Sequence, residues 1–231
     1  MSLKFAVPVA IATACLSLAG NLYAVPYNEV GDAGDLPSTA QAIAGPANTT
    51  LDSISGSLTL TNGISDSDMF RLFITNPATF SASTVGFIQG VNSFDSQIFL
   101  FNAAGLGVVG NDDNAVNGGS QAAIPAGSFN GPAGEYFLLI SGSGRYAASV
   151  GGLIFPNYTD NVTDPTTTVG PTGPGGGSPV TGYTGSSNEG GAYRVALTGA
   201  QFVVVPEPSS LAFAFVGAAG LALVQRARRR G

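Results

Sequence analysis

The chain has no histidine and no tryptophan, and its single lysine and single cysteine, Lys4 and Cys15, both lie near the amino terminus. Without histidine the commonest general base is missing, and neither a Ser-His nor a Cys-His nucleophile pair can form. The body of the protein also has no lysine for a phosphate-binding loop or a Schiff base. These absences argue against most classes of enzyme.

Charge is scarce as well, because only 10% of the 231 residues are charged. Residues 25–205 carry 13 acidic and 3 basic residues, a net charge of −10, whereas four of the eight basic residues occupy the last six positions. An acidic surface repels phosphate backbones, so nucleic acid is not an expected partner. A chain with 33 glycines, 14 prolines and few charges is typical of a turn-rich β protein outside the cytoplasm.

Residues 1–24 have the order of a secretory signal peptide. Lys4 is followed by an apolar run to about Ala19 and by a short stretch that ends at Ala24. Cleavage is predicted after Ala24, and the protein is therefore expected to be exported. Because Cys15 lies within the signal, the mature protein should have neither a disulfide nor a zinc–thiolate site.

Short alternating segments dominate residues 51–150. Phe70, Leu72 and Ile74 alternate with more polar residues, and the run at 136–140 is the most apolar of the body. No window of comparable length places apolar residues at helical spacing. Strands at about ten-residue intervals, separated by Gly, Asn and Asp, predict an all-β fold. We expect one β-sandwich or jelly-roll domain over residues 25–205, flanked by a signal helix and a short apolar helix.

The segment at about 156–190 is rich in glycine and proline, which disfavours helices and strands. Alternation resumes after it with Tyr193, Val195 and Leu197. A strand this late in the chain must pair with strands far upstream. The segment is therefore predicted to be a long surface loop within one domain, not a linker between two.

Residues 206–231 combine three features in order. They are Pro206-Glu207-Pro208, fourteen mostly apolar residues at 211–224, and a basic cluster formed by Arg226, Arg228, Arg229 and Arg230. As a helix, the apolar stretch would cover about 21 Å, short of the ~30 Å hydrocarbon core of a bilayer. Arginines beside an apolar segment stay on the cytoplasmic side and orient it. The pattern favours a temporary membrane segment, and a single-pass tail anchor is the alternative.

This three-part tail resembles the PEP-CTERM sorting signal of Gram-negative bacteria. The resemblance implies a tail that is held in the inner membrane and removed by a membrane protease, an exosortase. It also implies a destination at the cell surface, the outer membrane or the extracellular matrix, often in organisms that make exopolysaccharide.

The body carries a second resemblance. Residues 94–114 form an expected strand, a Gly-rich turn and an acidic tip, and together with 31–41, 66–74, 134–142 and 193–199 they are similar to the bacterial pre-peptidase C-terminal type of β-sandwich. The long insertion departs from that pattern. Members of this family are accessory domains, some of which bind calcium or extracellular polymers. By resemblance, Asp112 and Asp113, and in second place Asp32 and Asp35, are candidate calcium ligands, and plain hydration of these carboxylates is the alternative.

Two further functions stay open beside a non-enzymatic surface protein. A carbohydrate- or polymer-binding module, with or without calcium, would need Tyr146, Tyr158 or Tyr183 in an exposed coplanar row. A glycoside hydrolase would need Glu135 and Glu189 about 5–10 Å apart in a cleft. We expect the protein not to be an enzyme.

Overall fold

The computed structural model describes residues 24–84, 94–114, 119–156, 164 and 166–204, and every regular element in these ranges is a β-strand. The prediction of an all-β fold is therefore confirmed for the described residues. The strands are β1 (Val25–Asn28), β2 (Gln41–Ala42), β3 (Thr50–Leu58), β4 (Leu60–Thr61), β5 (Ile64–Ser65), β6 (Ser67–Ile74), β7 (Ser81–Ser83), β8 (Ser96–Asn102), β9 (Gly107–Asn111), β10 (Ala123–Ile124), β11 (Gly134–Gly142), β12 (Tyr146–Ser149), β13 (Gly152–Leu153), β14 (Gly182–Thr184) and β15 (Gly191–Gln201).

The two predicted helices fall on residues 1–24 and 206–231, which lie outside the described residues apart from Ala24. Within the described ranges, no helix has the length and apolar character needed to cross a membrane.

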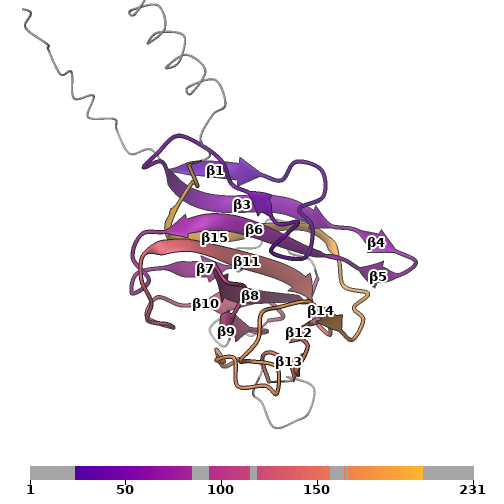
Figure 1. Ribbon diagram of the computed structural model, residues 1–231. Coiled ribbons are helices and arrows are strands. Elements are labelled where there is room, and N and C mark those ends of the chain that lie inside the picture. The colour runs from indigo at the N-terminus through magenta and orange to yellow at the C-terminus, as the bar shows by residue number, and fades with distance from the viewer. Residues whose placement is uncertain (1–23, 85–93, 115–118, 157–163, 165, 205–231) are drawn as a thin grey trace, which may run out of the picture.

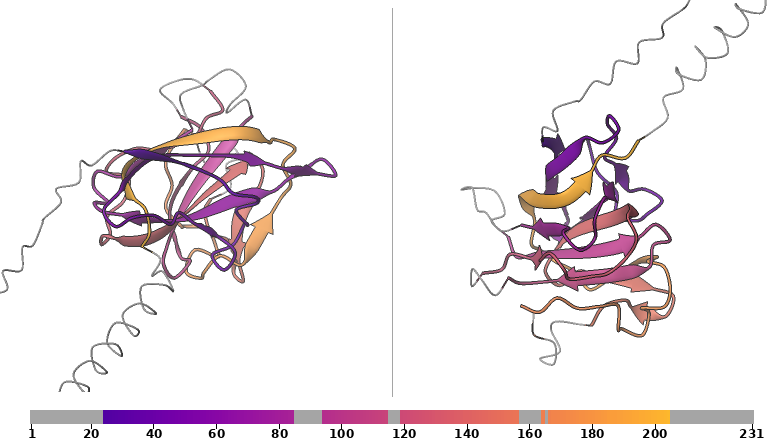
Figure 2. Two further views of the ribbon diagram at one scale, coloured as in Figure 1. Left: turned by 90° about the horizontal axis from the view of Figure 1, so that it is seen from above. Right: turned by 90° about the vertical axis from the view of Figure 1, so that its left-hand side faces the viewer.

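The largest sheet has the order β1-β3-β15-β6-β11-β8-β9, with β7 and β10 attached to it (Figure 1). The short strand β2 is also attached, through β6. Most pairs are antiparallel, whereas β1 with β3 and β2 with β6 are parallel, so the sheet is mixed. The longest strand, β15, is drawn in orange to yellow in Figure 2 and pairs with β3 on one side and with β7 on the other. A smaller sheet, β13-β12-β14, lies beside β8 and β9 (Figure 1).

The most apolar segment of the sequence becomes β11, which is hydrogen-bonded between β6 and β8. Its residues alternate between two cores, because successive side chains of a strand point to opposite faces. Leu138 and Ile140 face the larger core, which β3, β7 and β15 close from the other side. Phe137 and Leu139 face a smaller core under β12 and β14. Apolar layers on both faces of the same strands are consistent with a β-sandwich.

The Gly/Pro-rich segment closes the smaller core. Val169 and Gly110 exchange two backbone hydrogen bonds of 2.9 Å, and the N–H of Val180 donates to the carbonyl of Gly105 at 2.9 Å. Val180 is buried among the aromatic residues of that core. As composition predicts, the described part of the segment forms turns and only the short strand β14. Composition did not indicate that it covers apolar surface.

Gly107 makes this close packing possible, and substitution there should be destabilising. A Cβ atom at position 107 would lie 2.6 Å from Ile154 Cγ2 and 2.9 Å from Pro171 Cβ. We expect Gly107→Ala to lower the free energy of unfolding by about 1–3 kcal/mol, because the packed segment must shift. Gly134→Ala is the matched control, since a Cβ there meets no atom within 4 Å. Urea denaturation measures both variants, and equal stabilities would show that the segment does not pack on β9.

Candidate metal centre

Three aspartates meet where β8 begins and β9 ends. The two strands are antiparallel, and Ile98 pairs with Asn111. Asp95, just before β8, is therefore brought to Asp112 and Asp113, just after β9. One carboxylate oxygen from each of the three residues lies within 4.8 Å of the others. We call this group the β8–β9 cluster; it contains the two predicted ligands Asp112 and Asp113, and it adds Asp95.

The β8–β9 cluster is short of partners. Asp112 is 6% exposed, and the buried Oδ1 atoms of Asp112 and Asp95 have no hydrogen-bond partner. Burial, and then the charges of Asp95 and Asp113, raise the pKa of Asp112 to about 7, against the opposing effect of the nearby Gln97 and Ser143 side chains. Burial, and then the charges of Asp113 and Glu189, raise the pKa of Asp95 to about 6. Crowded carboxylates with raised pKa values are stabilised in their charged form by a bound cation.

The protein's own cations lie elsewhere. Arg71 pairs with Glu135 and Arg145 pairs with Asp35, each at 3.4 Å, and Arg194 donates to Ser53 Oγ at 3.3 Å. These are the three basic residues of the described ranges. The charge of the β8–β9 cluster is therefore not offset by an arginine or lysine of the described residues, and an oxygen-seeking metal ion matches its chemistry.

A second acidic group contains Asp32, another predicted ligand, together with Glu29 and Asp68. Here the protein itself supplies hydrogen-bond donors. The backbone N–H groups of residues 33 and 57 donate to the two carboxylate oxygens of Glu29, and the N–H of residue 34 donates to Asp32 Oδ1. The Tyr193 hydroxyl donates to Asp68 Oδ2 at 2.7 Å. Only Asp68 Oδ1 is buried without a partner. Burial, reinforced by the charge of Glu29, raises the pKa of Asp68 to about 8. This group is largely satisfied without a metal ion, in contrast to the β8–β9 cluster.

The fourth predicted ligand, Asp35, belongs to neither group. Its Oδ2 atom accepts a hydrogen bond from Arg145, and its backbone carbonyl accepts one from the Tyr183 hydroxyl. Arg145 also donates to Ser67 Oγ at 2.7 Å and lies 4.7 Å above the ring of Tyr183. Asp35 therefore connects the segment between β1 and β2 to β14, directly through Tyr183 and indirectly through Arg145.

The geometry does not favour the two alternative functions. Tyr146 is buried and Tyr183 is half-buried beneath Arg145, so these two do not form an exposed aromatic row, and Tyr158 lies outside the described residues. Glu135 opens β11, whereas the Glu189 backbone packs against Gly142 at the other end of that strand. Seven strand residues span about 23 Å, far beyond the separation that glycoside hydrolysis requires.

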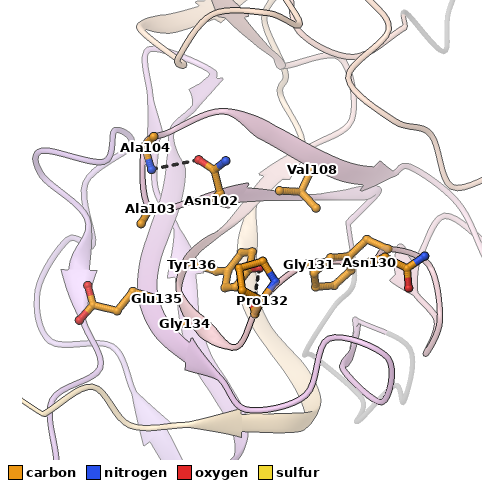
Figure 3. Close-up of a pocket in the computed structure, with 11 residues that line it drawn as sticks. Asn102, Ala103, Ala104, Val108, Asn130, Gly131, Pro132, Gly134, Glu135 and Tyr136 are labelled. Carbon is orange, nitrogen blue, oxygen red and sulfur yellow. Dashed lines mark hydrogen bonds between the residues drawn. The ribbon is translucent and has the colours of Figure 1, made fainter.

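An open hollow of about 440 Å³ lies between the β8–β9 turn and the loop before β11, and Figure 3 shows the residues that line it. Several polar groups around it are already hydrogen-bonded: Asn102 Oδ1 accepts from the Ala104 N–H at 2.9 Å, and the Tyr136 hydroxyl donates to the Pro132 carbonyl at 2.8 Å. Glu135 at its rim is paired with Arg71. The hollow therefore offers little to orient a ligand.

No family model, curated protein or solved structure matched this chain in the comparisons. The two resemblances drawn from the sequence thus remain predictions. The fold and the site define an all-β protein with an acidic cluster, at one end of its large sheet, in which two buried carboxylate oxygens have no hydrogen-bond partner. Sequence reasoning missed Asp95 as a member, because only the pairing of β8 with β9 brings it to Asp112 and Asp113.

Proposed function

We propose that this chain is an exported, non-enzymatic surface protein whose single β-sandwich or jelly-roll domain binds calcium through Asp95, Asp112 and Asp113. The observation that carries the proposal is the meeting of three carboxylates within 4.8 Å, with two buried oxygens that have no partner. Calcium is bound by carboxylate and carbonyl oxygens in flexible Gly/Asp loops. Zinc is a poor fit, because it prefers histidine and cysteine ligands.

Calcium binding to the purified full-length chain in mild detergent tests this part of the proposal. One ion per chain is expected, with a Kd on the order of 0.1–1 mM, the range of extracellular modules. Calorimetry is a suitable measurement, and absence of heat at millimolar calcium would contradict the proposed site.

Delivery is the second part of the proposal. The order of residues 1–24 supports export, and the order of residues 206–231 supports sorting by a PEP-CTERM-like signal. The first partners would be the inner membrane, transiently, and an exosortase-type protease that acts near Pro206-Glu207-Pro208. At its destination the protein would be in contact with exopolysaccharide. The described chain leaves the fold close to this motif, since Val203 is still hydrogen-bonded to Ile43 and Val204 is exposed.

Mass spectrometry of the mature surface protein tests the delivery. We expect a form that starts at Val25 and lacks roughly residues 207–231, because a cleaved signal and a cleaved tail remove both apolar ends. Expression in a strain without the exosortase is the control and should retain the tail in the membrane fraction. An intact arginine-rich terminus on the mature surface protein would contradict the sorting mechanism.

A further inference from the structure

Gln97 is an anomaly in the interior of the protein. Its side chain is fully buried, and neither Oε1 nor Nε2 has a hydrogen-bond partner in the structure. A buried amide without partners is unfavourable, and native proteins rarely leave both ends of one unsatisfied. The two polar atoms of this amide are therefore open to a ligand from outside the polypeptide.

The position of Gln97 places it at the β8–β9 cluster. Since Ile98 pairs with Asn111, the antiparallel register carries Gln97 next to Asp112. Asp95 lies two residues before Gln97, immediately before β8, and one of its carboxylate oxygens lies within 4.8 Å of oxygens of Asp112 and Asp113. The amide lies near enough to the Asp112 carboxylate to favour its charged form, without a hydrogen bond of ordinary geometry. A half-turn of the terminal amide exchanges its oxygen and nitrogen, so Oε1 can face the three carboxylates.

Glu189 approaches the same place from the loop between β14 and β15. Its Oε2 atom accepts a hydrogen bond from the backbone N–H of Asp95 at 3.2 Å. Gly142 allows this approach, because a Cβ atom there would collide with the Glu189 carbonyl and with Ser187 Oγ. Glu189 is not among the residues whose oxygens all lie within 4.8 Å of one another, but its charge raises the pKa of Asp95, so its carboxylate lies near the cluster.

We propose that Gln97 Oε1 and a carboxylate oxygen of Glu189 are additional protein ligands of the calcium ion, a deepening that rests on the proposed function. Calcium takes six to eight oxygens, and three aspartates alone leave it dependent on water. The neutral amide oxygen of Gln97 adds a ligand without adding to the repulsion among the carboxylates. Glu189 makes the ion a link between β8, the end of β9 and the loop that leads into β15.

The Gln97→Met variant tests this assignment, because methionine has a similar length and no oxygen. In calorimetric titrations of the full-length chain, the calcium affinity of Gln97→Met should fall by roughly tenfold or more. Its melting temperature in EDTA should be equal to that of wild type or higher, since an unsatisfied amide has been removed. A merely structural glutamine would give the opposite pattern, with lower stability in EDTA and unchanged affinity.

Three further variants complete the experiment. Gln97→Glu retains an oxygen and should bind calcium at least as well as wild type, which guards against a methionine variant that fails to fold. Glu189→Gln should weaken binding, whereas Glu135→Gln, at the other end of β11, should not. If wild type binds no calcium, the proposed function fails; if wild type binds calcium and Gln97→Met binds it equally well, only the present inference is overturned.

Discussion

Calcium should raise the melting temperature of the wild-type chain, and Asp112→Asn should abolish that rise. With a Kd of about 0.5 mM, about 5 mM calcium adds about 1.4 kcal/mol to the free energy of unfolding. For a domain of this size that corresponds to roughly 3–6 °C. Asp112 is the most buried member of the β8–β9 cluster, and asparagine at this position removes the charge at nearly constant shape.

The effect of calcium should also depend on pH. In the folded protein the pKa of Asp112 is raised to about 7 from its ordinary value of 3.8. Between these values the folded state holds a proton that the unfolded chain has lost. Without calcium, this group therefore lowers the free energy of unfolding as pH rises from about 4 to about 7. Calcium favours the ionised form, so its stabilising effect should be largest above pH 7 and small at pH 5.

Differential scanning calorimetry in calcium and in EDTA measures both effects. Asp52→Asn is the matched control, because Asp52 belongs to neither acidic group, and it should keep the full response to calcium. A calcium response that persists in Asp112→Asn would mean that the stabilising ion is bound elsewhere.

The second large effect concerns Asp68. This residue is 1% exposed, and burial raises its pKa to about 8. A carboxyl group whose pKa is raised on folding costs stability once pH exceeds its ordinary pKa, and the full cost is reached above pH 8. In EDTA at pH 8.5, Asp68→Asn should therefore increase the free energy of unfolding by an amount on the order of 2–5 kcal/mol. At pH 4 the wild type and the variant should be similar in stability.

Thermal melts of Asp68→Asn from pH 4 to pH 9 test this prediction. The variant keeps an oxygen that can accept the hydrogen bond from Tyr193, so only the ionisation is removed. A flatter dependence of melting temperature on pH is expected. An equally steep dependence, or a lower melting temperature at pH 8.5, would show that Asp68 is ionised and already well solvated in the folded protein.

The fold class could be predicted from the sequence, because the alternation of apolar and polar residues along a strand is a local signal. The apolar run at 136–140 became part of β11, an interior strand between β6 and β8, and the alternating segment at 69–75 became most of β6. The packing of residues 166–190 over the smaller core could not be foreseen. Glycine and proline indicate turns, but they do not indicate which apolar surface a turn will cover.

The candidate site was predicted only in part. Asp112 and Asp113 are adjacent in the sequence, whereas Asp95 and Gln97 reach them through the register of β8 with β9, which one sequence does not specify. Burial raises the pKa of Asp68 and removes the Gln97 amide from water. Like the strand register, burial is a property of the folded state that a single sequence does not specify. Asp35 was expected among the ligands, but the contact with Arg145 crosses 110 positions of the chain and has no local signature.

The most direct measurement is a crystal structure of the protein grown in calcium, with a second crystal soaked in a lanthanide for anomalous scattering. A single strong anomalous peak is predicted between Asp95, Asp112 and Asp113, with calcium–oxygen distances of about 2.3–2.6 Å. A peak confined to Glu29, Asp32 and Asp68, or no peak at all, would contradict a calcium ion at the junction of β8 and β9.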